Sequence, residues 1–137
     1  MLSAPLMPSS IGSYRIRLDG IRFRARHGAS RAERGLPQDF VVHLDVALPV
    51  SSLPRTDSRN RVFDYDKLAA LVVDEGTRGP YKLLEVLAER VIARVLADTP
   101  ATAVRVEVKK FGPPTSVSVD AVSIELTGRR DGNPGSS

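Results

Sequence analysis

The sequence predicts an α+β fold in which a four-stranded antiparallel sheet carries two helices on one face, with both helices lying between the second and third strands. Two observations predict it. Four segments alternate apolar and polar residues with the period of two of a half-buried strand, and two others place apolar residues at helical spacing. Their order is strand, strand, helix, helix, strand, strand, and two hairpins flanking a helix pair favour an antiparallel sheet with its helices on one face.

The first two strands are predicted at Tyr14–Arg26 and Gln38–Leu48. The first alternates, but its phase slips at Asp19 and Gly20, which is typical of a strand interrupted by a β-bulge. The second alternates without a break and places His43 on its polar side, so we expect that histidine to point outward into solvent.

The two helices follow a loop rich in proline and serine. Asp64 is suited to cap the first helix, which is expected to end within Gly76–Pro80. The second is predicted from about Lys82 to Asp98, where leucine, valine and alanine form a wide apolar stripe, and Pro100 ends it.

The last two strands are predicted at Val104–Lys110 and Val117–Leu126, the latter with a second phase slip near Ala121. A sheet of four strands leaves two outer edges without a partner, and pairing with neighbouring chains is a natural way to cover such edges. The pattern therefore favours association with further copies of the chain.

Length and composition indicate one globular domain. The 137 residues suffice to bury a core, and we expect a single domain at residues 13–128 with flexible tails, rich in Gly, Pro and Ser, at 1–12 and 129–137. No run has the apolar length of a signal-peptide core or a membrane span, so a cytoplasmic protein with no membrane partner is expected.

Charge and residue usage argue against several function classes. The excess of 20 Lys and Arg over 16 Asp and Glu is mild and only 5% of residues are aromatic, so no nucleic-acid partner is expected. The absence of cysteine excludes disulfides, thiolate nucleophiles and Cys-ligated metals. His27 and His43 lie on separate segments, and we expect no metal site.

Strand phase singles out Lys110. Alternation places it on the same face as the valines of its strand, while Lys109 falls on the polar face. A lysine on an apolar face must contact an anion or a cavity, or else extend its amine past the strand end into solvent, which is common.

Three further polar residues are candidates for chemistry. Glu33 lies in the loop between the first two strands, where a solvated carboxylate is the simplest interpretation. Tyr65 follows the cap of the first helix, where a tyrosine is usually half-buried with its hydroxyl in water. Glu85 interrupts a run of apolar residues near the start of the second helix, where backbone N–H groups and the helix dipole stabilise an anion.

Five blocks of residues, in chain order from about Ser13 to Arg130, resemble the dihydroneopterin aldolase family. The resemblance implies the family's tunnelling fold, which has the element order predicted above. The blocks are Gly20-Ile21-Arg22-Phe23 with His27-Gly28, Ala32-Glu33 with Gln38-Asp39-Phe40, Phe63-Asp64-Tyr65, Leu83-Leu84-Glu85 with Leu87-Ala88-Glu89-Arg90, and Val108-Lys109-Lys110 with Pro113-Pro114.

The resemblance implies a pterin site. Glu85 takes the place of the glutamate that anchors the pterin ring by accepting hydrogen bonds from its 2-amino group and N3–H, a bidentate contact that suits a carboxylate. Backbone groups of Leu84, and those around Phe63 and Ala29, would complete the slot that holds the ring.

The resemblance also implies a reaction. Lys110 matches the catalytic lysine, Glu33 a glutamate near the substrate side chain, and Tyr65 a tyrosine at the edge of the site. A base removes the 2′-hydroxyl proton of 7,8-dihydroneopterin, the C1′–C2′ bond breaks, and glycolaldehyde leaves while the electrons enter the ring imine. Reprotonation gives 6-hydroxymethyl-7,8-dihydropterin. Because the ring itself is the electron sink, the resemblance implies no cofactor, metal or Schiff base.

Family members form tetramers or octamers with sites between neighbouring subunits, so the resemblance implies a homo-oligomer of that kind. The resemblance leaves open whether the enzyme also epimerises C2′.

One alternative is a dihydroneopterin triphosphate 2′-epimerase, in which the arginines of the first strand would bind phosphate groups. A non-catalytic pterin-binding protein is the second alternative. The simplest interpretation of those arginines is a solvated face; they are Arg15, Arg17, Arg22, Arg24 and Arg26.

Overall fold

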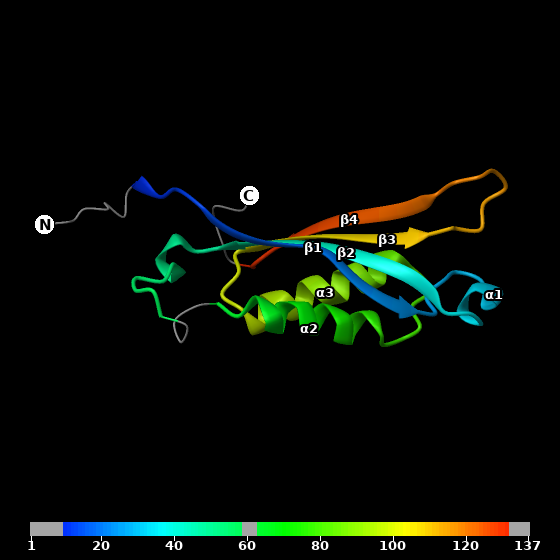
Figure 1. Cartoon of the computed structure of the whole chain (residues 1–137), viewed down its shortest axis with the longest axis horizontal. Coiled ribbons are helices and arrows are strands. Elements are labelled where there is room, and N and C mark those ends of the chain that lie inside the picture. The colour runs from blue at the N-terminus through cyan, green and yellow to red at the C-terminus, as the bar shows by residue number, and fades with distance from the viewer. Residues whose placement is uncertain (1–9, 59–62, 132–137) are drawn as a thin grey trace, which may run out of the picture.

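The chain folds as an antiparallel sheet with a helix pair against it (Figure 1). The structure is a computed structural model, and it describes residues 10–58 and 63–131. The strands lie in the order β1-β2-β3-β4, and each neighbouring pair is antiparallel. The elements are β1 (Tyr14–Ala25), α1 (Arg31–Arg34), β2 (Gln38–Leu48), the 3₁₀ helix η2 (Val50–Ser52), α2 (Tyr65–Gly76), α3 (Leu84–Asp98), β3 (Ala103–Phe111) and β4 (Ala121–Arg129).

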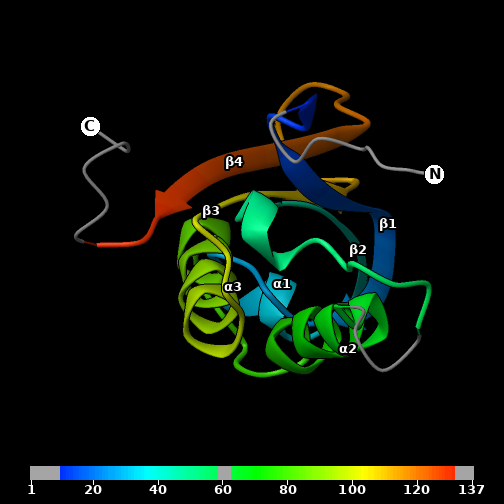
Figure 2. The ribbon, with the colours of Figure 1, turned by 90° about the vertical axis from the view of Figure 1, so that its left-hand side faces the viewer.

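The two long helices cover one face of the sheet, and the sheet curves around them (Figures 1 and 2). The helix α2 packs against β1, while α3 packs against β3 and β4. Both helices lie between the second and third strands in the chain, so the predicted α+β class is confirmed.

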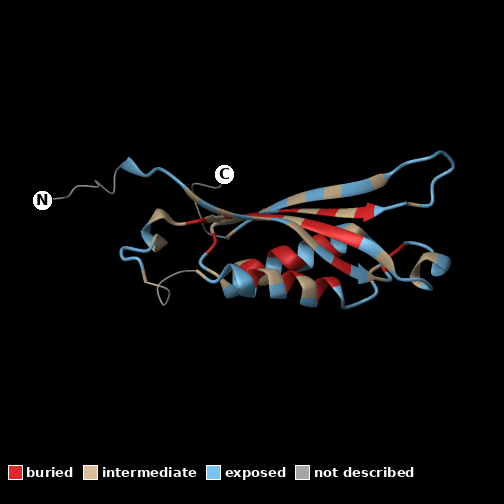
Figure 3. Cartoon of the chain, viewed as in Figure 1, coloured by how far each residue is buried: buried red, intermediate tan, exposed pale blue. Residues whose placement is uncertain are grey.

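The core lies between the sheet and the helices. Strand alternation turns every second residue of β2 and β3 toward the helices, and nearly all of these residues are apolar and buried. The apolar stripes of α2 and α3 meet them (Figure 3). Fully buried members of this core include Phe40, Val42, Leu44, Val46, Leu68, Val72, Leu87, Val91, Val95, Val104 and Val106.

The strand β1 contains the predicted bulge. Its pairing with β2 shifts between Leu18 and Ile21, where two residues of β1 stand opposite His43 alone. Gly20 has a φ of 78°, which favours glycine, and its N–H donates to Nδ1 of His43 at 3.0 Å. His43 lies on the helix-free face as predicted, but it is only partly exposed because its ring binds the bulge.

The bulge keeps four arginines of β1 on the helix-free face. Arg15 and Arg17 precede it at odd positions, whereas Arg22 and Arg24 follow it at even ones. The almost fully buried carboxylate of Asp45 accepts from Arg15 at 2.9 Å and from Arg17 at 3.3 Å. The face is exposed, as the sequence predicts, but these two arginines are bound to the sheet rather than free in solvent.

The helix ends agree with the prediction in part. Asp64 caps α2, because its carboxylate accepts the N–H of Asp66 at 3.0 Å. The helix α3 begins at Leu84, two residues after the predicted start at Lys82, since Leu83 keeps an extended backbone. The short helices α1 and η2 fall in segments predicted as loops.

The last strand differs from the prediction. It begins at Ala121 rather than Val117 and continues to Arg129. Val117 and Val119 alternate like strand residues, but β3 ends at Phe111, whose partner is already Ala121, so no strand of the described residues lies opposite the two valines. The prediction of a phase slip near Ala121 in this strand is also wrong, because β3 and β4 pair in regular register throughout.

The outer edges of the sheet are β1 and β4, and among the described residues neither has a further strand beside it. The predicted tails lie largely outside the described residues, although Arg130 is held in place by hydrogen bonds from its guanidinium to the carbonyls of Leu96, Thr99 and Ala101. Over the described ranges, the helices are too short or too polar to cross a membrane.

Candidate active site

Several segments meet at one end of the sheet. The end of β1, the start of β2 and the end of β3 lie together there, because Phe23 pairs with Phe40 and Phe40 pairs with Lys110. The loop between α2 and α3 joins them, since the N–H of Gly28 donates to the carbonyl of Tyr81 at 3.0 Å. The connection between α2 and α3 therefore lies at the same end of the sheet as Lys110.

Lys110 lies inside this end of the molecule. Its side chain is on the helix-covered face, as strand phase predicts, and the residue is 4% exposed. Its Nζ contacts the carboxylate of Glu33 and donates to the carbonyl oxygen of His27 at 3.2 Å. Of the alternatives that the sequence leaves open, the structure has the anionic partner and not the extension into solvent.

Glu33 is held in place by the short helix α1. The Ser30 hydroxyl accepts the N–H of Glu33 at 3.1 Å, and the Glu33 carboxylate accepts the N–H of Ser30 at 3.2 Å, which together form a capping box. Gly28 lets the loop approach, because a Cβ at that position would lie 2.4 Å from the Cβ of Glu33. With its side chain 14% exposed, Glu33 is not the solvated carboxylate that the loop position suggests.

The contact with Lys110 fixes the charge of Glu33. The hydrogen bond from Lys110 is the main reason why the pKa of Glu33 lies below the ordinary carboxyl value; the bonds from Ser30 add to the shift, and burial opposes it. Glu33 is thus a carboxylate at neutral pH. The pair holds a proton acceptor and a proton donor in direct contact, an arrangement suited to acid–base chemistry.

His27 was not assigned to the site from the sequence beyond its place in the His27-Gly28 block. Its ring is fully buried, with Nε2 2.6 Å from the carbonyl oxygen of Gly76 and Nδ1 accepting the N–H of Tyr81 at 2.9 Å. Burial lowers the pKa of His27, the bond to Gly76 opposes that shift, and the charge of Lys110 adds to it.

Glu85 is available to a ligand at the same end of the sheet. It lies in the first turn of α3, it is exposed, and no hydrogen bond or ion pair within the described residues engages its carboxylate. Its neighbour Leu84 packs, partly buried, against the core and so fixes the start of the helix. Ala29 is exposed, and its carbonyl accepts a hydrogen bond from Arg34 at 2.9 Å.

Tyr65 and Phe63 lie at the opposite end of the helix layer. Tyr65 is the first residue of α2, and Gly76, the last, bonds to His27 beside Lys110. With a rise of 1.5 Å per residue, the helix separates its two ends by roughly 17 Å. The structure therefore brings Lys110, Glu33 and Glu85 to one end of the chain and leaves Tyr65, which is 62% exposed, at the other.

A cavity of about 610 Å³ lies between α2 and α3, and of the predicted site residues it includes only Phe63. This cavity therefore does not join the candidate residues. In the part of the chain that the structure describes, no three His, Cys, Asp or Glu side chains are grouped as metal ligands would be.

Sequence comparison relates the chain to known proteins over most of its length. The family model of dihydroneopterin aldolase matches residues 16–127. The dihydroneopterin aldolase of Bacillus subtilis (strain 168) is 32% identical over 117 residues, which cover 85% of this chain and 98% of that protein. The dihydroneopterin aldolase of Methylorubrum extorquens is 31% identical over 109 residues, which cover 78% of this chain and 84% of that protein.

Solved structures share the fold. Dihydroneopterin aldolase from Burkholderia thailendensis, bound to guanine, matches with a TM-score of 0.72 and 28% identity over 87% of this chain and 93% of that one. The E. coli dihydroneopterin aldolase in complex with neopterin matches with a TM-score of 0.75 and 19% identity over 84% of this chain and 98% of that one. The sheet with two helices between its second and third strands is thus the fold of these aldolases.

Proposed function

The chain belongs to the dihydroneopterin aldolase family and is a lyase of folate biosynthesis, and we propose that its reaction takes place where Lys110, Glu33 and Glu85 lie. The observation that carries this proposal is the contact between the buried Lys110 and the partly buried Glu33. A buried ion pair contributes little net stability compared with apolar side chains of the same volume. Acid–base chemistry explains better why this pair stands at the end of an otherwise apolar face.

In this proposal Glu85 binds the pterin ring. Its carboxylate is exposed and unpaired within the described residues, and it has two oxygens to accept from the 2-amino group and N3–H of the ring. The N-terminal turn of α3 stabilises the negative charge. Guanine, which is bound to the relative from Burkholderia thailendensis, offers an equivalent pair of donors, its 2-amino group and N1–H, and this supports a role for a carboxylate at that position.

Lys110 and Glu33 act on the side chain of 7,8-dihydroneopterin. A proton leaves the 2′-hydroxyl through an ordered water to the pair of Lys110 and Glu33, the C1′–C2′ bond breaks, and its electron pair enters the ring imine as glycolaldehyde departs. Glu33 orients the side chain and, through its contact with Lys110, returns a proton to give 6-hydroxymethyl-7,8-dihydropterin. Because the contact joins a proton donor to a proton acceptor, the pair can take up a proton and later return it.

The alternative of a dihydroneopterin triphosphate epimerase has less support. It needs the arginines of β1 near the substrate phosphates, yet Arg15 and Arg17 lie on the helix-free face and bind Asp45. Lys110 points to the helix-covered face of the same sheet. The relatives named above are all aldolases, which also favours cleavage over epimerisation.

Product analysis tests this function. The protein should convert dihydroneopterin to the hydroxymethyl pterin with release of one glycolaldehyde per turnover, measured by chromatography of the pterins under reducing conditions. Dihydroneopterin triphosphate is the parallel substrate. An epimerised triphosphate without any cleavage of dihydroneopterin would replace the proposal with the epimerase, and binding of the product without turnover of either substrate would favour the non-catalytic alternative.

The complete site, in our proposal, lies between two subunits of a tetramer or octamer. One chain supplies Lys110, Glu33 and Glu85, and the far end of α2 in a neighbour supplies Tyr65 and the backbone near Phe63. The distance of roughly 17 Å along α2 supports this, because one chain cannot bring both sets together. The open edges of β1 and β4 offer the surfaces through which strands of neighbouring chains can pair.

Subunit mixing tests the shared site. The variants Lys110→Ala and Tyr65→Ala should each be impaired alone, and co-refolding equal amounts should restore activity. In randomly mixed rings about one quarter of the sites receive an intact Lys110 from one subunit and an intact Tyr65 from the next. If each site belonged to a single chain, the mixture would have only the average activity of the two variants.

A further inference from the structure

The imidazole of His27 ties the loop that follows β1 to the connection between α2 and α3. It lies between the Gly76 carbonyl and the Tyr81 N–H, which come from the end of α2 and from the loop after it. These partners are 49 and 54 residues away in the chain. The backbone carbonyl oxygen of the same residue, His27, accepts a hydrogen bond from Nζ of Lys110.

The partners fix the tautomer of the ring. Because the backbone N–H of Tyr81 is a donor, Nδ1 must accept, and because the carbonyl of Gly76 is an acceptor, Nε2 must carry the hydrogen. Both bonds form only while the imidazole is neutral. Burial acts in the same direction by lowering the pKa of His27.

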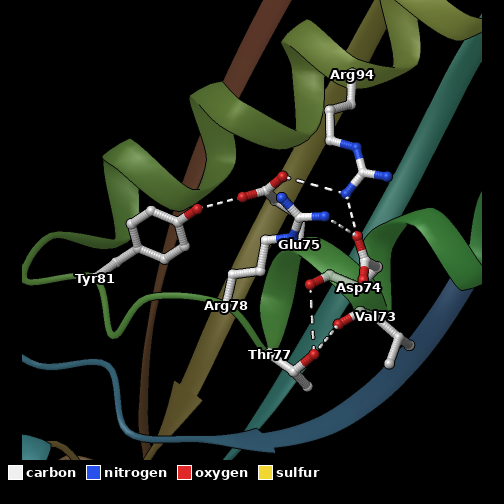
Figure 4. Close-up of polar contacts among 7 residues, drawn as sticks. All are labelled: Val73, Asp74, Glu75, Thr77, Arg78, Tyr81 and Arg94. Carbon is white, nitrogen blue, oxygen red and sulfur yellow. Dashed lines mark hydrogen bonds and ion pairs between the residues drawn. The ribbon is translucent and has the colours of Figure 1, made fainter.

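The loop that holds the ring is itself anchored to both helices (Figure 4). The Tyr81 hydroxyl donates to the carboxylate of Glu75, which lies one residue before the end of α2. Arg94 of α3 donates to Glu75 at 3.3 Å and to Asp74 at 2.7 Å, and Arg78 donates to Asp74 at 2.8 Å. The His27 ring is therefore bound to a part of the backbone with little freedom to move.

We propose that His27 is a positioning residue for Lys110. Its neutral ring anchors the His27 backbone to the loop between α2 and α3, and the His27 carbonyl then holds the Lys110 amine beside Glu33. This inference rests on the proposed role of Lys110 in catalysis. It goes further, because it names a second group that fixes the Lys110 amine. With Glu33 alone, the amine of this long, flexible side chain would have only one partner.

A histidine with only a structural role would behave differently. It would stabilise the fold, and its loss would reduce the amount of folded enzyme without changing the environment of Lys110. A positioning residue must act through Lys110, so its effect on rate should disappear once the Lys110 amine is gone. The accessibility of the Lys110 amine should also change when the ring is lost.

Amine labelling tests the proposal without any use of catalysis. Lys110 and the exposed Lys67 are acetylated with acetic anhydride in the native protein, and the rate at each site is read by mass spectrometry of fragmented peptides. Lys110 should react at least about ten-fold more slowly than Lys67, because its amine is buried and hydrogen-bonded. Equal rates at the two lysines in the unsubstituted protein would overturn the proposal, whatever reaction the enzyme performs.

Variants of His27 then separate position from stability. His27→Asn keeps an acceptor near Nδ1, and His27→Gln keeps a donor near Nε2, so each retains one of the two ring bonds. Both should increase the labelling rate of Lys110 and, since a displacement of about 1 Å can cost up to about 100-fold, slow single-turnover cleavage by about 10- to 100-fold. His43→Asn is the matched control, because His43 also accepts a backbone N–H through Nδ1 but lies on the helix-free face.

A double-substitution cycle completes the test. In the Lys110→Ala background, His27→Asn or His27→Gln should change the residual rate by no more than about two-fold. An equal loss of rate with and without Lys110 would show that His27 acts on the fold and not through the lysine. Unchanged labelling of Lys110 in both folded His27 variants would also refute the proposal.

Discussion

Replacing Lys110 with alanine tests the role of the buried pair, and Lys109→Ala is its control. Lys110→Ala leaves the carboxylate of Glu33, 14% exposed, without its strongest partner, although the bonds from Ser30 remain. Breaking such a pair should cost about 2–4 kcal/mol of folding stability. Lys109 lies on the helix-free face, opposite Val41, so its removal should change stability by less than about 0.5 kcal/mol.

The loss of stability is too small to explain the expected loss of rate. A domain with only about 5 kcal/mol of stability would retain at least about 1 kcal/mol, so roughly four fifths or more of the molecules stay folded. Loss of a general acid–base group should slow cleavage by about 10²- to 10⁴-fold. The rate deficit of Lys110→Ala must therefore come from the chemical step.

Single-turnover cleavage and product binding separate the two effects. Cleavage is followed with enzyme in excess by rapid quenching and chromatography, and the dissociation constant of the hydroxymethyl product by calorimetry. Lys110→Ala should lose the rate while the dissociation constant stays within a few-fold, since Glu85, the proposed ring anchor, is unchanged. If Lys109→Ala lost the cleavage rate while Lys110→Ala kept it, both the predicted strand phase and the assignment of the catalytic lysine would be refuted.

Two further predictions concern the carboxylates. Glu85→Ala should raise the dissociation constant of the hydroxymethyl product about 30- to 150-fold, the equivalent of the roughly 2–3 kcal/mol of a charge-assisted hydrogen-bonded pair, and an unchanged constant in calorimetry would contradict its role on the ring. Because its pKa is lowered from 4.5 in the folded protein, Glu33 should contribute its full stability above about pH 4.5 and lose it as the pH falls through the lowered value. The difference in urea midpoint between the unsubstituted protein and Glu33→Gln should therefore shrink below that pH, and a difference that grew on acidification would be evidence against the ion pair.

Helices and strands could be predicted where apolar residues on one face and polar residues on the other alternate without interruption. Gln38–Leu48 was predicted to the residue, because one face of β2 packs on the helices and the alternation is unbroken. The same reasoning failed at Val117, since alternation shows that a segment could be a strand but not whether another strand lies opposite it. The start of β4 is set by where β3 ends, which is information outside the segment.

The placement of the candidate residues could be predicted where it depends on local geometry. Strand phase alone places Lys110 on the covered face, and the structure confirms it. The burial of Glu33 had a readable signal as well, because Ser30 and Glu33 have the spacing of a capping box and so predict a helical turn in the loop. The burial of His27 had none beyond the family block, since both partners of its ring are backbone groups about fifty residues away.

The placement of Lys110 and Tyr65 at opposite ends of one chain has a consequence for counting active sites. If each site forms at a junction, an open row of subunits always contains one site fewer than it has chains, whereas a closed ring contains as many sites as chains. The activity per chain would then depend on whether the ring of subunits is closed, and not only on whether the subunits are associated. With the proposed shared site, dilution that opened the rings would lower the specific activity before any subunit unfolded, so the specific activity would depend on the protein concentration.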